Sequence, residues 1–285
     1  MEIISLLKWP LLACLLLPWL LVYLGLHIVQ RQIIFVDLAL AQVAALGAAL
    51  AMLLGYDVHD WQSYAFSLGF TFVGAVLFTF TRTGNHRVPQ EALIGIVYVV
   101  AAAAGILVLS HSTGGKEELQ RSMVGELLVV QHVEIFKMFA LFVAVGVIHF
   151  LFRKKFLAVS ADPVAAAAQG ISVRWWDFVF YMLFGLVVTS FVHVGGVLLA
   201  FTFLIVPAVC ANYLADSMGP RLIIGWGVAT VGSLLSLVVT AKLDFPIGAT
   251  IVCGLAVLLV LTMIVAALRG RMTGPASAPA PVARH

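Results

Sequence analysis

The chain has 285 residues, of which 63% are hydrophobic and only 10% are charged. A soluble domain carries about 25% charged residues, so this composition, with a mean hydropathy of +1.12, excludes a soluble enzyme or binding module and indicates an integral membrane protein in a lipid bilayer. The formal net charge of +3 comes from basic residues scattered among apolar runs, which argues against a nucleic-acid partner.

Apolar runs of about 18 or more residues are typical of helices that cross a membrane. The chain contains about nine such runs, so we expect an all-α, polytopic membrane helix bundle with eight or nine transmembrane helices. The expected spans cover residues 3–29, 33–54, 61–80, 92–109, 135–152, 175–192, 197–214, 222–241 and 246–268. They form one transmembrane domain over residues 1–270. Residues 271–285 are rich in Pro and Ala, and we expect them to be a disordered cytoplasmic tail.

The orientation of the bundle follows from Lys and Arg, which gather in the cytoplasmic loops of membrane proteins. The densest basic group, residues 153–155, precedes the loop that joins the fifth and sixth expected spans. If this loop lies inside, most of the 16 basic residues fall in inside loops. The acidic links at Asp57/Asp60 and Glu117/Glu118 then fall outside. We therefore predict an outside N-terminus and an inside C-terminus.

The loop between the fifth and sixth spans carries a short helix of its own, at about residues 162–170. Asp162 followed by Pro163 is typical of an N-cap with proline in the first helical position. Gly170 is placed to end the helix in a left-handed conformation. A short, rigid helix on the cytoplasmic side suits contact with another protein. The alternative is an ordinary surface connector, and the loop alone does not decide between the two.

Two polar residues lie in the second span, where an ionisable group is costly and indicates function. Asp37 lies near the cytoplasmic end, and Gln42 lies five residues deeper, about 7 Å along the helix axis. Five residues rotate a helix by about 500°, so the two side chains diverge by about 140° and do not share a face. Asp37 is either part of a substrate path or a helix cap. Gln42 either lines that path or makes an interhelical hydrogen bond.

Histidines also occur in or beside the spans. His193 borders the outer end of the sixth span, where it either lines an access route or is an interfacial histidine bonded to backbone or water. His27 and His149 have no second metal ligand in the neighbouring sequence, which favours a structural role. The chain contains no Walker sequence, nucleophile elbow or HExxH motif, so we expect neither ATP hydrolysis nor other catalysis by this chain.

Three segments carry specific patterns. They are DPVAAAAQGI at residues 162–171, VGGVLLAFTFLIVPAVCANYLA at 194–215 and LDFPIGATIV at 243–252. In this order and spacing they resemble the integral-membrane permease of the metal-cation ABC transporter family, whose members take up zinc, manganese or iron. The resemblance runs from about residue 31 to about residue 265, which is nearly the whole chain.

The resemblance implies a permease subunit of an importer that moves a divalent transition-metal ion across the bacterial cytoplasmic (inner) membrane. Alternating access would be driven by a separate ATPase chain. The implied partners are cytoplasmic ABC ATPase subunits, an extracytoplasmic metal-binding protein and a second permease in a homodimer or pseudodimer. No cofactor is implied besides the transported ion. The helix at 162–170 would be the coupling helix that docks in the ATPase, with Asp162, Pro163, Ala166 and Gly170 as its defining residues.

One position departs from the family pattern, in which the second span carries an Asp and, four residues later, a His as mid-membrane metal ligands. Here Gln42 stands at the His position and Leu38 at the Asp position, with Asp37 displaced by one residue. An amide oxygen is a poor ligand for zinc-like metals. The site is therefore altered, shifted toward metals that prefer oxygen ligands, or lost. We expect the substrate path to include Asp37, Gln42 and His193.

The residues also leave open a different class of transporter. A lone intramembrane Asp37 fits an ion- or proton-coupled secondary transporter. Against this alternative, the chain lacks paired interrupted helices in corresponding halves.

Overall fold

The computed structural model describes residues 2–57, 60–81, 88–112, 114–125 and 127–270. These residues form helices and contain no strand, which confirms the all-α prediction. The elements in chain order are α1 (Glu2–Leu16), α2 (Pro18–Arg31), α3 (Val36–Leu53), α4 (Trp61–Thr81), α5 (Gln90–Leu109), α6 (Gly115–Val124), the 3-10 helix η1 (Leu127–Val129), α7 (His132–Leu151), α8 (Arg153–Ala161), α9 (Pro163–Ala168), α10 (Val173–Leu214), α11 (Met218–Leu243) and α12 (Ile247–Leu268).

Eight stretches of the described chain are helices long and apolar enough to cross a membrane. One of them, α10, has 42 residues and a non-helical Gly196 with φ 75° and ψ 165°. At 1.5 Å per residue a straight helix of this length would extend about 63 Å, about twice the thickness of a bilayer core. We therefore treat α10 as two membrane-crossing helices joined at Gly196. They correspond to the separate sixth and seventh spans predicted from the sequence.

α10 is the central element of the bundle and packs against α2, α3, α4, α11 and α12. Helices in lipid gain little from burying apolar surface against one another, so close packing depends on small residues. Gly25 of α2 is the clearest case, because a Cβ there would lie 1.8 Å from the carbonyl oxygen of Leu204 in α10. A Cβ on Gly47 of α3 would lie 2.7 Å from the carbonyl oxygen of Phe66 in α4. Both helix pairs thus meet backbone to backbone.

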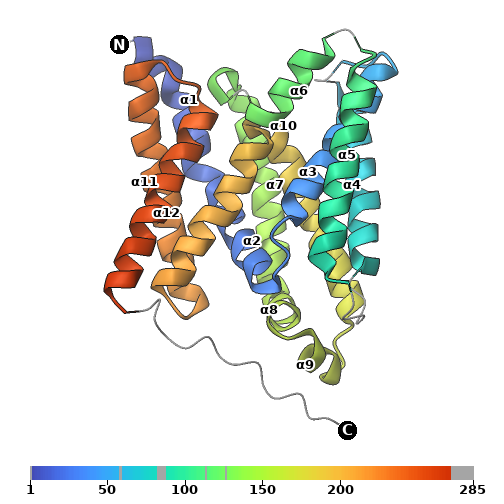
Figure 1. The fold of residues 1–285 in the computed structure, drawn as a ribbon, viewed down its shortest axis with the longest axis vertical. Coiled ribbons are helices and arrows are strands. Elements are labelled where there is room, and N and C mark those ends of the chain that lie inside the picture. The colour runs from blue at the N-terminus through green and yellow to red at the C-terminus, as the bar shows by residue number, and fades with distance from the viewer. Residues whose placement is uncertain (1, 58–59, 82–87, 113, 126, 271–285) are drawn as a thin grey trace.

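The two ends of the bundle carry different short helices (Figure 1). α6 lies at the end where α1 begins, and α8 and α9 lie at the opposite end, where α12 stops. The sequence prediction likewise separates residues 111–132 from residues 153–174. Which end faces the cytoplasm stays a prediction from the charge distribution. The predicted tail, residues 271–285, lies outside the described residues.

The predicted orientation can be tested with single cysteines at Glu117 in α6 and Ala167 in α9, both exposed positions. The native cysteines, Cys14, Cys210 and Cys253, are first replaced by alanine. We expect a membrane-impermeant maleimide added to intact cells to label position 117 and to reach position 167 only after permeabilisation. A cysteine at the neighbouring Ala166, which is 1% exposed, is the control for accessibility. Labelling of positions 117 and 167 from the same side would contradict the topology.

Candidate functional site

A cavity of about 80 Å³ lies among α3, α5, α6 and the first half of α10. One wall consists of small residues of α3 and α5, including Ala45, Ala49 and Gly105. The polar side chains around the cavity are Gln42, Glu118, Arg121, Ser122, Thr189 and His193. Two of the three residues that the sequence assigned to a substrate path, Gln42 and His193, therefore line one space although they are far apart in the chain.

The imidazole of His193 is fixed by its neighbours. Its Nδ1 lies 2.9 Å from the backbone oxygen of Thr189. A carbonyl oxygen can only accept, so Nδ1 carries a proton and donates it in this bond. The ring also contacts the ring of Tyr64 edge to face, with 5.8 Å between centroids, and the Tyr64 hydroxyl is hydrogen-bonded to Ser190 at 2.7 Å. The orientation of the His193 ring is therefore fixed, with Nδ1 directed at the Thr189 carbonyl.

Gln42 is 4% exposed and lies on the cavity side of α3. Its Nε2 is 3.9 Å from the sulfur of Met123, which follows the cavity-lining part of α6. A thioether is a weak acceptor, so the N–H end of the amide is directed toward sulfur. The stronger acceptor, Oε1, is the other end of the same group.

Asp37 lies in the first turn of α3, five residues from Gln42, and is not among the residues that line the cavity. Its Oδ1 accepts a hydrogen bond of 2.7 Å from the backbone N–H of Leu38. The N-cap position of α3 is Phe35, so Asp37 is inside the helix rather than its cap. The carboxylate is 1% exposed, and its Oδ2 has no hydrogen-bond partner among the described residues. The structure thus separates Asp37 from Gln42, in agreement with their 140° divergence.

A second cavity, of about 540 Å³, adjoins the first at the α6 end of the bundle. We call it the vestibule. The two spaces share Glu118 and Arg121 in their linings, so they are neighbours. The described lining of the vestibule contains three carboxylates, Asp57, Glu117 and Glu118, against one guanidinium, Arg121. Such an excess of negative charge in a concave site attracts cations. A polar route therefore leads from the α6 end to Gln42 and His193.

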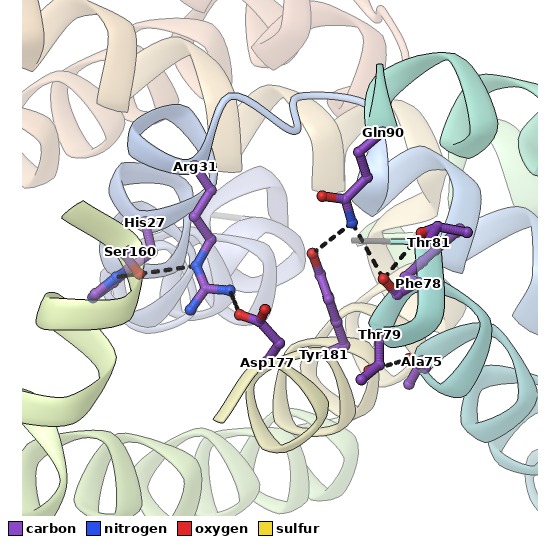
Figure 2. Close-up of polar contacts among 10 residues, drawn as sticks. All are labelled: His27, Arg31, Ala75, Phe78, Thr79, Thr81, Gln90, Ser160, Asp177 and Tyr181. Atoms are coloured by element: carbon purple, nitrogen blue, oxygen red, sulfur yellow. Dashed lines mark hydrogen bonds and ion pairs between the residues drawn. The ribbon is translucent and has the colours of Figure 1, made fainter. Parts of the chain in front are cut away.

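The opposite end of the bundle contains a buried ion pair (Figure 2). Arg31, the last residue of α2, binds Asp177 of α10 at 2.7 Å, and both side chains are 1% exposed. The Arg31 Nε also donates to the hydroxyl of Ser160 in α8 at 2.8 Å. The guanidinium carbon lies 3.8 Å from the ring centroid of Phe180. In the sequence Arg31 is only a loop charge, because its partner is 146 residues away.

His27 and His149 lie close to this ion pair. Their ring centroids are 6.2 Å apart, and Tyr23 contacts both rings edge to face. The Nδ1 of His27 is 2.9 Å from the hydroxyl of Ser160. The sequence gave no sign that the two histidines meet, because they lie on different helices. Among the residues that the structure describes, no three or more His, Cys, Asp or Glu side chains gather to hold a metal ion.

The predicted short helix at residues 162–170 is present as α9. The Oδ1 of Asp162 accepts from the backbone N–H groups of Val164 and Ala165 at 2.9 and 3.0 Å, with Pro163 in the first helical position. Gly170 has φ 78° and closes the helix, and the N–H of Ile171 donates to the carbonyl of Ala166 at 3.1 Å. Both predicted caps are confirmed. The preceding helix α8 was not predicted.

The faces of α9 are unequal. Val164 is 78% exposed, whereas Ala166 is 1% exposed. Ala166 therefore packs against the rest of the protein, and Val164 lies on the outer face of α9. Because α9 follows α8 directly, the Ser160–Arg31 contact anchors this exposed helix to α2 and α10.

Comparison with known proteins gives consistent matches. The family model described as ABC 3 transport family matches residues 4–266. The manganese import system permease protein ScaB of Streptococcus gordonii is 23% identical over 242 residues, which cover 85% of this chain and 84% of that protein. The manganese transport system membrane protein MntC of Listeria monocytogenes is 24% identical over 232 residues, or 80% of this chain and 79% of that protein.

The fold also matches a solved structure. PsaBC from Streptococcus pneumoniae, determined in complex with Fab, has a chain that superposes with a TM-score of 0.78 at 21% sequence identity. The match covers 96% of this chain and 99% of that chain. The bundle described above is therefore a fold found in a solved protein.

The buried ion pair predicts the effect of a single substitution. Arg31→Met should destabilise the protein by about 3–5 kcal/mol, because it leaves the Asp177 carboxylate buried without its cation. The double variant Arg31→Met, Asp177→Leu removes both charges and should regain much of the loss. Arg174→Met, at an exposed position near the same end, is the control. Thermal unfolding of the purified protein in detergent measures all three. Equal melting temperatures for Arg31→Met and Arg174→Met would contradict the role given to the ion pair.

Proposed function

Because this chain belongs to the ABC 3 transport family, we propose that it is the membrane permease subunit of an ATP-driven importer for a divalent transition-metal ion. Family membership makes the chain a membrane transport component rather than an enzyme, so ATP hydrolysis belongs to a separate chain. The observation that carries the proposal is the polar route at the α6 end. It leads from a vestibule rich in carboxylates to a small cavity with an amide, a carboxylate and an imidazole.

The proposed cargo is manganese, with iron as the next choice. The cavity offers oxygen atoms from Gln42 and Glu118 beside the nitrogen of His193. Oxygen ligands suit Mn²⁺, whereas zinc is favoured by imidazole and thiolate. The names of the two relatives from Streptococcus gordonii and Listeria monocytogenes both refer to manganese, which supports the same choice.

Asp37 is proposed to act farther along the same route. It lies at the end of α3 opposite the vestibule, and its buried carboxylate is suited to attract a cation that leaves the cavity. The alternative of an ion- or proton-coupled carrier rests on this residue. Asp37 does not line the cavity, so it is separate from the proposed binding step, and family membership favours the ATP-driven mechanism.

The partners follow from the two ends of the bundle. We propose that α9 docks in a cytoplasmic ATPase subunit, with Val164 at the contact and Asp162, Pro163, Ala166 and Gly170 holding the helix in place. An extracytoplasmic metal-binding protein would deliver the ion at the α6 end. A second copy of the permease would complete the transporter, in the cytoplasmic membrane of a bacterium.

The function is tested by the metal content of cells that express this chain together with its ATPase subunit. Manganese, iron and zinc are measured by mass spectrometry after growth in defined medium. We expect manganese to accumulate several-fold above cells that lack the chain. The gain should vanish when the Walker lysine of the ATPase is replaced, because transport then loses its energy source. Unchanged content of all three metals would overturn the proposal.

The docking of α9 has its own test. Val164→Asp places a charge on the proposed contact, and Gly170→Val strains a position with φ 78°, where β-branched residues are disfavoured. We expect both to weaken co-purification of the ATPase and to reduce uptake, with normal insertion of the permease.

Two matched controls exist in the chain. Val88→Asp makes the same change at an exposed valine outside α9, and Gly55→Val makes the same change at φ 92° near the other end. If the α9 variants retain the ATPase as well as these controls do, α9 is only a connector.

A further inference from the structure

The polar lining of the inner cavity contains few good ligands for a divalent cation. Of the described lining residues, Glu118 and His193 supply a carboxylate and an imidazole, while α3 contributes one amide and several alanines. We infer that the transported cation is bound between Glu118 of α6 and His193 of α10, and that α3 supplies a wall and a secondary oxygen. This inference rests on the proposed function and assigns the ligands of its binding step.

His193 meets the requirement for a metal ligand that is oriented in advance. Metal-binding histidines usually donate their second ring N–H to a carbonyl or carboxylate, which fixes the tautomer. The Nδ1 of His193 makes this bond to Thr189 at 2.9 Å, so Nε2 is the ligand atom. The hydroxyl of Thr189 is in turn 2.8 Å from that of Thr71 in α4. The turn of α10 that carries His193 is therefore tied to a neighbouring helix.

Glu118 is placed at the passage between the two spaces. It lines both the vestibule and the inner cavity, whereas the adjacent Glu117 lines the vestibule alone. An ion that moves inward from the vestibule therefore passes Glu118 before it reaches Gln42. Glu118 is also half-buried, and a carboxylate attracts a cation more strongly as water is excluded.

Close backbone contact sets the position of α6 relative to α10. A Cβ on Gly125, which ends α6, would lie 2.2 Å from the backbone carbon of Gly195. A Cβ on Gly196 would lie 2.4 Å from the backbone nitrogen of Gly125. The end of α6 is thus wedged into the kink of α10, two to three residues after His193. This contact holds the helix of Glu118 against the helix of His193 without intervening side chains.

The remaining lining residues suit an ion in transit. Gln42, Ser122 and Thr189 offer neutral oxygens, and water would fill the other positions around the ion. Arg121 places a fixed positive charge next to Glu118 and lowers the affinity. A transport site must release its ion, so binding has to be moderate. One carboxylate and one imidazole, opposed by a guanidinium, provide such a site.

The inference also accounts for the departure at Gln42. The family pattern that the sequence resembles places a carboxylate and an imidazole on one span. In this chain both ligand types are retained, but they come from α6 and α10 and meet at the cavity that α3 borders. The absence of a His at position 42 then means that another helix, α10, supplies the imidazole ligand.

The test uses four variants of the permease–ATPase complex, purified through a tag on this chain. Glu118→Gln and His193→Gln alter the proposed ligands. Glu134→Gln and His132→Gln make the same chemical changes at the start of α7, at residues that line neither cavity. Mn²⁺ binding is titrated by electron paramagnetic resonance, and uptake of Mn²⁺ is measured in proteoliposomes. We expect the first pair to lose about tenfold or more in affinity, and the second pair to stay within about twofold of the unmodified protein.

Two further variants separate a ligand role from a structural one. Glu118→Asp keeps the carboxylate and should retain more Mn²⁺ binding than Glu118→Gln, while Gln42→Ala should cost less than either ligand change. If Gln42→Ala has the larger effect, α3 carries the site and the inference is wrong. Equal binding by the ligand variants and the two α7 controls also overturns it. An unmodified complex that transports none of manganese, iron or zinc would instead overturn the proposed function.

Discussion

The buried ion pair between Arg31 and Asp177 is the interaction on which the α8–α9 end of the bundle depends. Two charges at 1% exposure are tolerated because each neutralises the other across a contact of 2.7 Å. The same guanidinium holds Ser160, so α8 and the attached α9 are joined to α2 and α10 at one point. The first half of α10 then runs without a break from Asp177 to His193, about 24 Å at 1.5 Å per residue. One continuous helix thus connects the α8–α9 end with the cavity lined by His193.

A second constraint is the close packing of helices in a lipid bilayer, where burial of apolar surface contributes little to their association. Gly25 against Leu204, and Gly125 against Gly195 and Gly196, bring backbones into direct contact. At the second place the left-handed φ of Gly196 also allows α10 to turn back on itself. The position that permits the turn is therefore the one that receives α6. As a result, the geometry of the cavity is set by backbone contacts, which flex less than long side chains.

Local rules explain what the sequence could predict. Apolar runs gave the spans, and the pattern Asp162-Pro163 with Gly170 gave both caps of α9, because capping depends on residues within one or two turns. Pairing over long distance had no local signature. Neither the partner of Arg31 nor the meeting of Glu118 with the cavity of Gln42 follows from spacing along the chain. The outward direction of Val164 and the burial of Ala166 likewise required the packed structure.

The proposed cation site explains why a change in one helix need not remove a site. A cation is bound by the ligand atoms around it, whichever segment of the chain carries them. Function therefore belongs to the site rather than to a single sequence motif. α3 faces the cavity with alanines at 44, 45, 48 and 49, which leave room for ligands from its neighbours. In the proposed site α6 has that role, because its end packs directly against the kink of α10. On the proposal above, a helix with Gln42 in place of an imidazole still borders the cation site, because α6 and α10 supply a carboxylate and an imidazole from the other walls.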